Sequence, residues 1–454
     1  MGLFAALNAS VSGLRAQSNA LENISGNIAN SRTTGFKRVD TSFVDLVSNS
    51  NTSINAQRSG AVLSNSRQTN TVSGVVQRSD TGTHMAISGD GYFVVQKKIG
   101  EADGRPILEE VPYYTRRGDF SLDKDGYLVN GAGYYLNTIE LDDTTGNPVG
   151  SVPTVLRVDN DFMEADATTE ITYKGNLASY PQTTNADKNV VGSELMNPAN
   201  YTNDPTVGGA GFVQAADETR FLADSIAGGA ITAYTANGST ASVQMRWSKT
   251  STSPDTWNLF YLTDSTATGA NAKWRNVGQN YIFNATGELN PPLASVTVTS
   301  LTIDGVNLGN ISLNHGGDGM TQFSNSNGNA KVNISQNGAA AGELLDVKIS
   351  DTGKIVASYS NSKTRNIAEI PLASFNGDNY LARQDGGVFR QTEESGQAIL
   401  GATGSIEGSA TEASNTDIAE EFSKMIVTQQ AYSANTRVLT TSKDMLQEIM
   451  QVIR

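Results

Sequence analysis

Cysteine is absent from this 454-residue sequence, and histidine occurs only twice, as His84 and His315. Disulfide bonds and thiolate chemistry are therefore excluded, and a Ser-His-Asp triad or a zinc site has few residues to draw on. The sequence also lacks a G-x-S-x-G element, a phosphate-binding loop and a G-x-G-x-x-G motif between a strand and a helix. We predict no catalytic residue, no metal site and no cofactor, so an enzyme is not expected.

Basic residues and long apolar runs are also scarce. Lysine and arginine number 32 against 46 acidic residues, and the net charge of −14 disfavours binding to nucleic acid. No apolar run approaches the ~18–20 residues of a membrane span, so membrane insertion is not expected. The first residues have no basic segment, and the run from Leu3 to Leu7 is shorter than the ~7–15-residue core of a signal peptide. Export, where it occurs, is expected to proceed without a cleaved signal peptide.

Both ends of the chain show apolar residues at helical spacing. Near the N-terminus the repeating positions are Leu7, Leu14, Leu21 and Ile28, and near the C-terminus they are Ile418, Phe422, Met425, Tyr432, Leu439 and Leu446. Spacings of three and four residues place each set on one helical face. Ser414 with Asp417, or Asp417 with Glu420, predicts the start of the second helix. These helices either belong to an ordinary core or form a self-assembly seam completed by neighbouring copies, because a lone helix of this length is marginal in water.

The middle of the sequence has the marks of β-structure. Asp-Gly and Asn-Gly pairs, which suit tight hairpins, occur repeatedly from residue 90 to residue 386. Strands are expected at 92–96, 120–122, 127–129, 296–303 and 345–349. Residues 121–126 resemble the start of a calcium-binding loop, but Ser121 and Ala132 occupy ligand positions, so a hairpin turn is expected there instead. Residues 180–295 are polar and predict an outward-facing β module with a thin core, or a partly disordered segment.

The predicted fold is α+β and mainly β, with N- and C-terminal helices forming a coiled-coil-like inner domain and with discontinuous outer β-rich domains. Residues 1–35 and 412–454 would form the helical inner domain, and residues 36–83 an extended linker with little helix. Residues 84–155 and 360–411 would form a middle β domain. Residues 156–359 would form one outer β domain, or two modules with 180–295 inserted.

Sequence motifs at both ends resemble the flagellar rod, hook and hook-associated axial proteins. The N-terminal signature comprises Asn27, Ile28, Ala29 and Asn30 followed by Gly35, Phe36 and Lys37, and the C-terminal signature begins with Ser414 and Asn415. The stretch from Ile87 to Val95 resembles a core that rod and hook members share, and residues 320–396 are similar to the hook members in particular. Gly26 replaces a usual asparagine, and Thr416 replaces a usual aliphatic residue.

The resemblance implies a structural subunit of the bacterial flagellar hook. Such a subunit polymerises into a curved tube that transmits torque from motor to filament as a universal joint. The implied partners are further copies of the chain, rod and hook–filament junction proteins, the hook cap and the flagellar type III export apparatus. The implied location is the extracellular flagellum. A junction or distal rod protein of the same family, and a secreted β-rich adhesin or carbohydrate-binding module, remain the alternatives.

Overall fold

The structure is a computed structural model that describes residues 3–47, 59–142, 145–160, 162–208, 211–317, 319–401 and 404–452. The chain divides into two compact units. The first, called the terminal unit here, comprises residues 1–160, 345–358 and 364–454 and so contains both ends of the chain. The second, called the inserted unit, comprises residues 161–344 and 359–363.

The terminal unit combines two long helices with many short strands. Its elements up to residue 155 are α1 (Leu3–Ala29), β1 (Val39–Val47), β2 (Ser59–Gln68), β3 (Val76–Arg78), β4 (Met85–Ser88), β5 (Tyr92–Ala102), β6 (Arg105–Leu108), β7 (Tyr113–Thr115), β8 (Phe120–Leu122), β9 (Leu128–Asn130), β10 (Tyr134–Glu140) and β11 (Thr154–Val155). The returning chain adds β22 (Leu344–Ile349), β23 (Lys354–Tyr359), β24 (Thr364–Glu369), β25 (Leu372–Ser374), β26 (Ala382–Gln384), β27 (Val388–Arg390), β28 (Ile399–Leu400), β29 (Ser405–Gly408), β30 (Ala410–Glu412) and α3 (Ile418–Val452).

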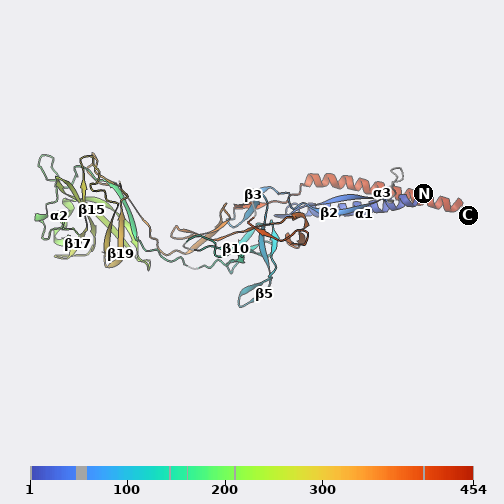
Figure 1. The fold of residues 1–454 in the computed structure, drawn as a ribbon, viewed down its shortest axis with the longest axis horizontal. Coiled ribbons are helices and arrows are strands. Elements are labelled where there is room, and N and C mark those ends of the chain that lie inside the picture. Colours follow the sequence, from blue (N-terminus) through green and yellow to red (C-terminus); the bar gives the residue numbers. More distant parts are fainter. Residues whose placement is uncertain are drawn as a thin grey trace. The chain divides into compact units, whose positions relative to one another are not determined.

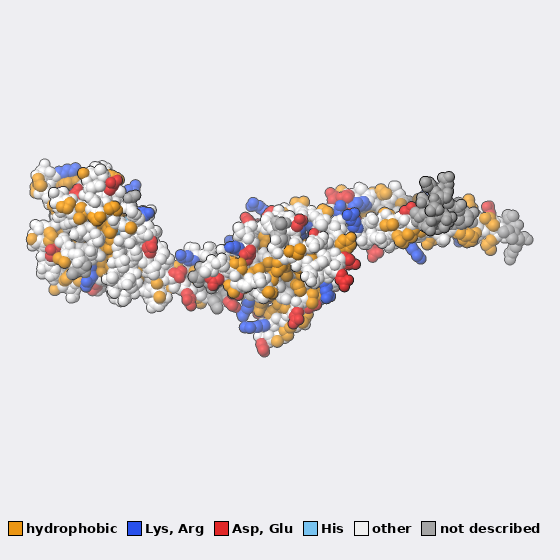
Figure 2. All heavy atoms as spheres, viewed as in Figure 1, with side chains coloured by type: hydrophobic (Ala, Val, Ile, Leu, Met, Phe, Trp, Pro, Cys, Tyr) orange, Lys and Arg blue, Asp and Glu red, His pale blue; other side chains and the backbone are white. Residues whose placement is uncertain are grey.

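Helices α1 and α3 pack side by side although they lie at opposite ends of the sequence (Figure 1). Asp417 caps α3, because its carboxylate accepts hydrogen bonds from the backbone N–H groups of Ala419 at 2.8 Å and Glu420 at 3.2 Å. This confirms one of the two predicted caps. Antiparallel strands β1 and β2 form a hairpin that packs on α1. Hydrophobic side chains remain at the surface along the helices (Figure 2).

The largest sheet of the terminal unit joins both parts of the chain, and two further two-stranded sheets pair β4 with β29 and β3 with β30. The main strand order of the largest sheet is β22-β23-β24-β10-β5-β7-β27-β26. The first four residues of β5, Tyr92–Val95, are buried on both faces. The Tyr92 ring meets Phe375 and Phe389 edge-to-face with centroid distances of 5.9 and 5.8 Å. This aromatic core connects residues near 92 to residues near 389 and holds the returning chain in register.

The inserted unit is built from two sheets. Its elements are β12 (Glu170–Asn176), β13 (Phe212–Gln214), α2 (Glu218–Ala223), β14 (Ile226–Tyr234), β15 (Thr240–Thr252), β16 (Asp255–Leu262), β17 (Ala272–Phe283), β18 (Ser295–Ile303), β19 (Val306–Asn314), β20 (Met320–Thr321) and β21 (Lys331–Gln336). One sheet has the order β13-β17-β16-β15-β14, and the other has the order β18-β19-β12-β20 with β21 also paired to β12.

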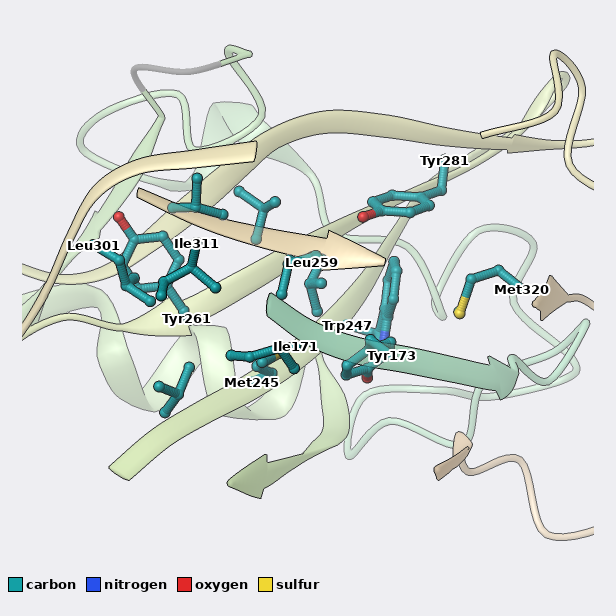
Figure 3. Close-up of a cluster of buried hydrophobic side chains, with 14 of the residues drawn as sticks. Ile171, Tyr173, Met245, Trp247, Leu259, Tyr261, Tyr281, Leu301, Ile311 and Met320 are labelled. Atoms are coloured by element: carbon teal, nitrogen blue, oxygen red, sulfur yellow. The ribbon is translucent and has the colours of Figure 1, made fainter. Parts of the chain in front are cut away.

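The core of the inserted unit lies between these sheets, where Trp247 and Tyr281 of one meet Tyr173 of the other (Figure 3). The indole N–H of Trp247 donates to the Tyr173 hydroxyl at 2.7 Å, and both residues are fully buried. The prediction of a thin core for residues 180–295 was therefore wrong. The large buried aromatics lie on β15, β16 and β17, within a segment that also holds many Thr, Ser and Asn residues, so average polarity concealed them.

Most of the predicted strands are confirmed. The expected strand at 120–122 matches β8, and those at 92–96, 127–129, 296–303 and 345–349 overlap β5, β9, β18 and β22. The predicted hairpin turn after β8 is present, since the Asp123 carboxylate accepts from the backbone N–H of Asp125 and of Tyr127. Within 36–83, β1 and β2 pair as a hairpin, and residues 48–58 lie outside the described residues. The predicted domain boundaries within the terminal unit stay a prediction.

Candidate assembly site at the two chain ends

One face of α1 carries asparagines that fasten the hairpin to the helix. Asn23 donates to Thr41 at 2.9 Å and to Ser66 at 3.0 Å. One turn further on, Asn27 donates to the carbonyl of Val39 at 3.0 Å and accepts from its N–H at 2.9 Å. Asn23 and Asn27 are four residues apart, so they lie on the same face of α1, and this face contacts the hairpin. Asn27 therefore binds strand β1 as another strand would.

The same asparagine also connects α1 to α3. The Asn27 amide donates to the Glu421 carboxylate at 2.9 Å, and Lys424 binds the other oxygen of Glu421 at 2.9 Å. Glu421 is 1% exposed, so its charge is held by these two partners. Farther along, α1 and α3 approach at Gly13, where an added Cβ would lie 2.8 Å from the Asn435 side-chain nitrogen. A larger residue at position 13 would therefore require the Asn435 side chain to move.

A buried ionic cluster joins Lys37 of the N-terminal signature to Glu412, two residues before the C-terminal signature. The Lys37 ammonium lies 2.5 Å from one Glu412 oxygen, and Arg116 lies 3.5 Å from the other. Lys37 also donates to the Val72 carbonyl at 2.8 Å, and the backbone N–H of Gly74 donates to Glu412 at 2.8 Å. Burial lowers the pKa of Lys37 from its ordinary value, the Glu412 carboxylate opposes this, and Arg116 adds to it. The cluster ties residues 37, 116 and 412 into one polar core.

The residues before Lys37 explain the glycine and the aromatic of the N-terminal signature. Gly35 has φ +68°, and an added Cβ would lie 2.6 Å from the backbone nitrogen of Arg117. Its N–H donates to the Glu412 carbonyl at 2.8 Å. Phe36 is buried beneath the Arg383 guanidinium, 4.2 Å from the ring centroid. A larger residue at position 35 would collide with the backbone of Arg117 and push the two segments apart.

The start of the C-terminal signature contacts the segment that follows the N-terminal signature. The region where residues 35–38, 72–74, 116 and 412–415 meet is called the junction below. The Asn415 side-chain oxygen accepts from the backbone N–H of Arg38 at 2.7 Å, and its amide donates to the Val72 carbonyl at 3.1 Å. Ser414 accepts from the backbone N–H of Thr416 at 3.2 Å. Motif residues from both ends of the sequence therefore meet in one place. The remaining motif residues lie less deep: Ile28 and Asn30 are half-buried, and Ala29 is exposed.

The predicted seam residues are only partly covered within one chain. Leu7, Leu14, Leu21 and Ile28 are half-buried, as are Met425, Leu439 and Leu446, whereas Ile418, Phe422 and Tyr432 are exposed. The fully buried positions on α1 instead include Gly13, Ala16, Ala20 and Ile24. A single chain packs the helices through small side chains and leaves the larger ones at the edge of the contact. The assembly role of the seam stays a prediction.

Sequence analysis assigned no contact to Arg116, Asn23 or Glu421. Asn19, Asn23 and Asn27 stand four residues apart, and that repeat was a visible signal for a polar contact along α1. Nothing local distinguishes Arg116 from its neighbour Arg117, which pairs with Asp119 at 2.8 Å. Its burial beside Glu412 depends on a strand from the far end of the sequence.

Cavities near the junction do not gather reactive groups. A groove of about 380 Å³ between α1, β1 and α3 is lined by residues that include Ala20, Ile24, Phe43, Glu421 and Lys424. Across the described ranges, no three His, Asp or Glu side chains are grouped so that they could hold a metal ion. Among the helices the structure describes, none is both long enough and apolar enough to cross a bilayer.

Comparisons with known proteins cover both ends and much of the middle. Four family models match: "Flagella basal body rod protein" at residues 7–37, "Flagellar hook protein FlgE/F/G D1 domain" at 86–177, "Flagellar basal body protein FlaE D2 domain" at 225–339, and "Flagellar basal body rod FlgEFG protein C-terminal" at 407–452. The first and last matches contain the helices and most of the junction.

Curated relatives match along the whole chain. Flagellar hook protein FlgE of Brucella suis biovar 1 is 28% identical over 467 residues and covers 100% of both chains. The Escherichia coli K12 protein of that name is 29% identical over 98% of this chain and 100% of its own. Among solved structures, flagellar hook protein FlgE2 of Helicobacter pylori matches with a TM-score of 0.46 and 17% identity, over 73% of this chain and 99% of that chain.

Proposed function

We propose that this chain, a member of the flagellar rod, hook and hook-associated axial protein family, works as a structural subunit of the flagellar hook. Copies polymerise into a curved tube that passes torque from the motor to the filament while it bends. The full-length match to curated hook proteins is the observation that carries the proposal. It favours the hook over the adhesin and carbohydrate-binding alternatives.

The exposed apolar side chains of the terminal helices supply the physical basis for polymerisation. Phe422 is 50% exposed and Tyr432 is 41% exposed, and both lie on α3 next to the contact with α1. Fully burying such a side chain is worth about 1.5–3 kcal/mol. A neighbouring copy that covers the seam would gain this energy several times over. The seam residues Leu7, Leu14, Leu21 and Ile28 lie on the corresponding edge of α1.

Partners and location follow from the same proposal. The subunit would contact copies of itself, rod and hook–filament junction proteins, the hook cap and the type III export apparatus, in the external flagellum. Export would not involve a cleaved signal peptide. The role is structural rather than enzymatic, and the net charge of −14 disfavours nucleic acid as a partner.

Charge placed in the seam should block polymerisation without unfolding the chain. We expect Leu14→Asp and Leu439→Asp to keep the circular dichroism spectrum and tryptophan fluorescence of the parent but to form no tubes by electron microscopy. Both side chains are half-buried in one chain, which leaves apolar area that a neighbouring copy can cover.

Asn8→Asp in α1 and Gln430→Asp in α3 are the matched controls, because both positions are exposed and lie outside the predicted seam. They should polymerise normally. Normal tubes from the seam variants would contradict the seam's role, and straight rods from the parent chain would favour a rod protein of the same family.

A further inference from the structure

The hairpin of β5 and β6 extends beyond the sheet of the terminal unit and carries exposed apolar side chains near its end. Ile99 is 63% exposed and Ile107 is 45% exposed. Figure 2 shows hydrophobic, basic and acidic side chains together at this projecting end. Pro106 lies in β6, and its missing N–H makes the strand edge a poor template for adding another strand. A partner would therefore be recognised by the hairpin's side chains.

An apolar pocket in the same unit is of a size to receive such side chains. Its volume is about 570 Å³, and its apolar lining includes Ile139, Leu372, Leu400 and Ile406. Leu400 is 43% exposed, so part of this lining faces outward. Asp351 and Glu369 line the pocket as well, whereas its described lining contains no lysine or arginine.

Strand register keeps the hairpin end away from the pocket of its own chain. Tyr134 of β10 pairs with Lys97 of β5, and Leu136 pairs with Val95. Leu372, which lines the pocket, pairs with Phe93 of β5, six residues from Ile99 along the strand. At ~3.3 Å per residue the separation is about 20 Å, and the hairpin points away from the pocket. The two features therefore lie at opposite ends of one strand pair.

We propose that the end of the β5–β6 hairpin inserts Ile99 and Ile107 into this pocket on a second copy of the chain. The proposal rests on the proposed function, since it requires a polymer. Between residues 97 and 105 the hairpin carries three basic residues (Lys97, Lys98, Arg105) and two acidic ones, a net charge of +1. The pocket lining contributes two carboxylates, so charge favours the contact as well as shape.

The geometry of this contact gives an open-ended assembly. The hairpin end and the pocket are different surfaces of the same unit, so the contact is heterologous and each copy keeps one unused hairpin and one unused pocket. Repetition adds copies in a row along the strand direction. This row is a second connection between copies, separate from the seam on the terminal helices.

Engineered disulfides test the contact directly, because the parent chain has no cysteine. The double variant Ile99→Cys/Leu400→Cys would be polymerised, oxidised and separated on a denaturing gel without reductant. A disulfide needs Cβ atoms about 3.5–4.5 Å apart, so it reports close approach. The matched control is Ile99→Cys/Val75→Cys, because Val75 is 70% exposed and lies outside the pocket lining.

A ladder of covalent oligomers at least tenfold more abundant than in the control would support the contact. The ladder should appear in polymer and not in dilute monomer. Tubes that form from the double variant but give no more cross-linked product than the control would overturn the inference while the proposed function stands. If the parent chain forms no polymer at all, the proposed function fails and this inference fails with it.

Discussion

Glu412 joins the two ends of the chain because it is the one carboxylate that contacts both Lys37 and Arg116 in the buried cluster. The two cations and one anion leave an excess positive charge, which the carbonyls of Val72 and Gly89 help to offset by accepting hydrogen bonds. Buried charges of this kind are tolerated only while each keeps its partners. The family resemblance pointed to Lys37, but no sequence pattern identified its partners, since their proximity depends on distant strands.

Removing the carboxylate charge should destabilise the terminal unit strongly. We expect Glu412→Gln to lower the free energy of unfolding by about 3–5 kcal/mol, because Lys37 and Arg116 would remain buried without a counter-charge. Urea unfolding followed by circular dichroism measures this. Glu407→Gln, at an exposed position within β29, is the control and should change stability by less than about 0.5 kcal/mol. Equal effects from the two variants would show that the cluster contributes no specific stability.

At the scale of elements, α1 and α3 show both the strength and the limit of periodicity. The seven-residue spacing correctly predicted two long helices at the ends, and Asp417 correctly predicted where the second begins. Periodicity did not show which face of α1 a single chain buries. That face runs through Gly13, Ala16 and Ala20. These small residues contribute little to a hydrophobic pattern, but they let the two helices approach closely. The leucines therefore flank the contact.

Two glycines of α1 offer a matched test of this close approach. Gly13→Val should weaken the packing of α1 on α3 by about 1–3 kcal/mol, because the added atoms meet Asn435. Gly26→Val meets nothing within 4 Å and should be neutral or slightly stabilising, since valine is a better helix former than glycine. Thermal unfolding followed at a helical wavelength compares them. Indistinguishable melting of the two variants would mean that position 13 does not limit the approach.

At the scale of the whole molecule, the chain builds one unit from both of its ends and another from its middle. The sequence predicted that discontinuity, because helical patterns at both ends with β-structure between them imply a chain that leaves the helical layer and returns to it. The inserted unit was less predictable, because its buried aromatics lie within a segment that is polar on average. All three tryptophans of the sequence, Trp247, Trp257 and Trp274, belong to it. Tryptophan fluorescence therefore reports on this unit alone.

Acid should unfold the inserted unit through His315. This side chain is buried, with Nδ1 2.8 Å from the Tyr173 carbonyl and Nε2 2.9 Å from the Tyr281 hydroxyl. Burial lowers the pKa of His315 below its ordinary 6.5, so the unfolded chain binds more protons than the folded one as pH falls below 6.5. Stability should then decrease by up to about 1.4 kcal/mol per pH unit. Urea titrations read by tryptophan fluorescence at pH 7 and below measure this.

His315→Gln provides the control, because glutamine keeps a donor and an acceptor but does not titrate in this range. The variant should lose part of the pH dependence between pH 6.5 and 5 even if its stability at pH 7 is lower. An unchanged slope would assign the acid sensitivity to other groups in the unit.

The separation of Lys37 from Glu412 also sets an order of events during synthesis. These residues are 375 positions apart. Ribosomes add ~5–20 residues per second, so Lys37 emerges about 20–75 s before its counter-ion exists. The strands of the inserted unit are all translated within that interval. In a nascent chain the inserted unit can therefore fold before the terminal unit is complete, because α1 has no α3 to pack against until residues 418–452 have been translated.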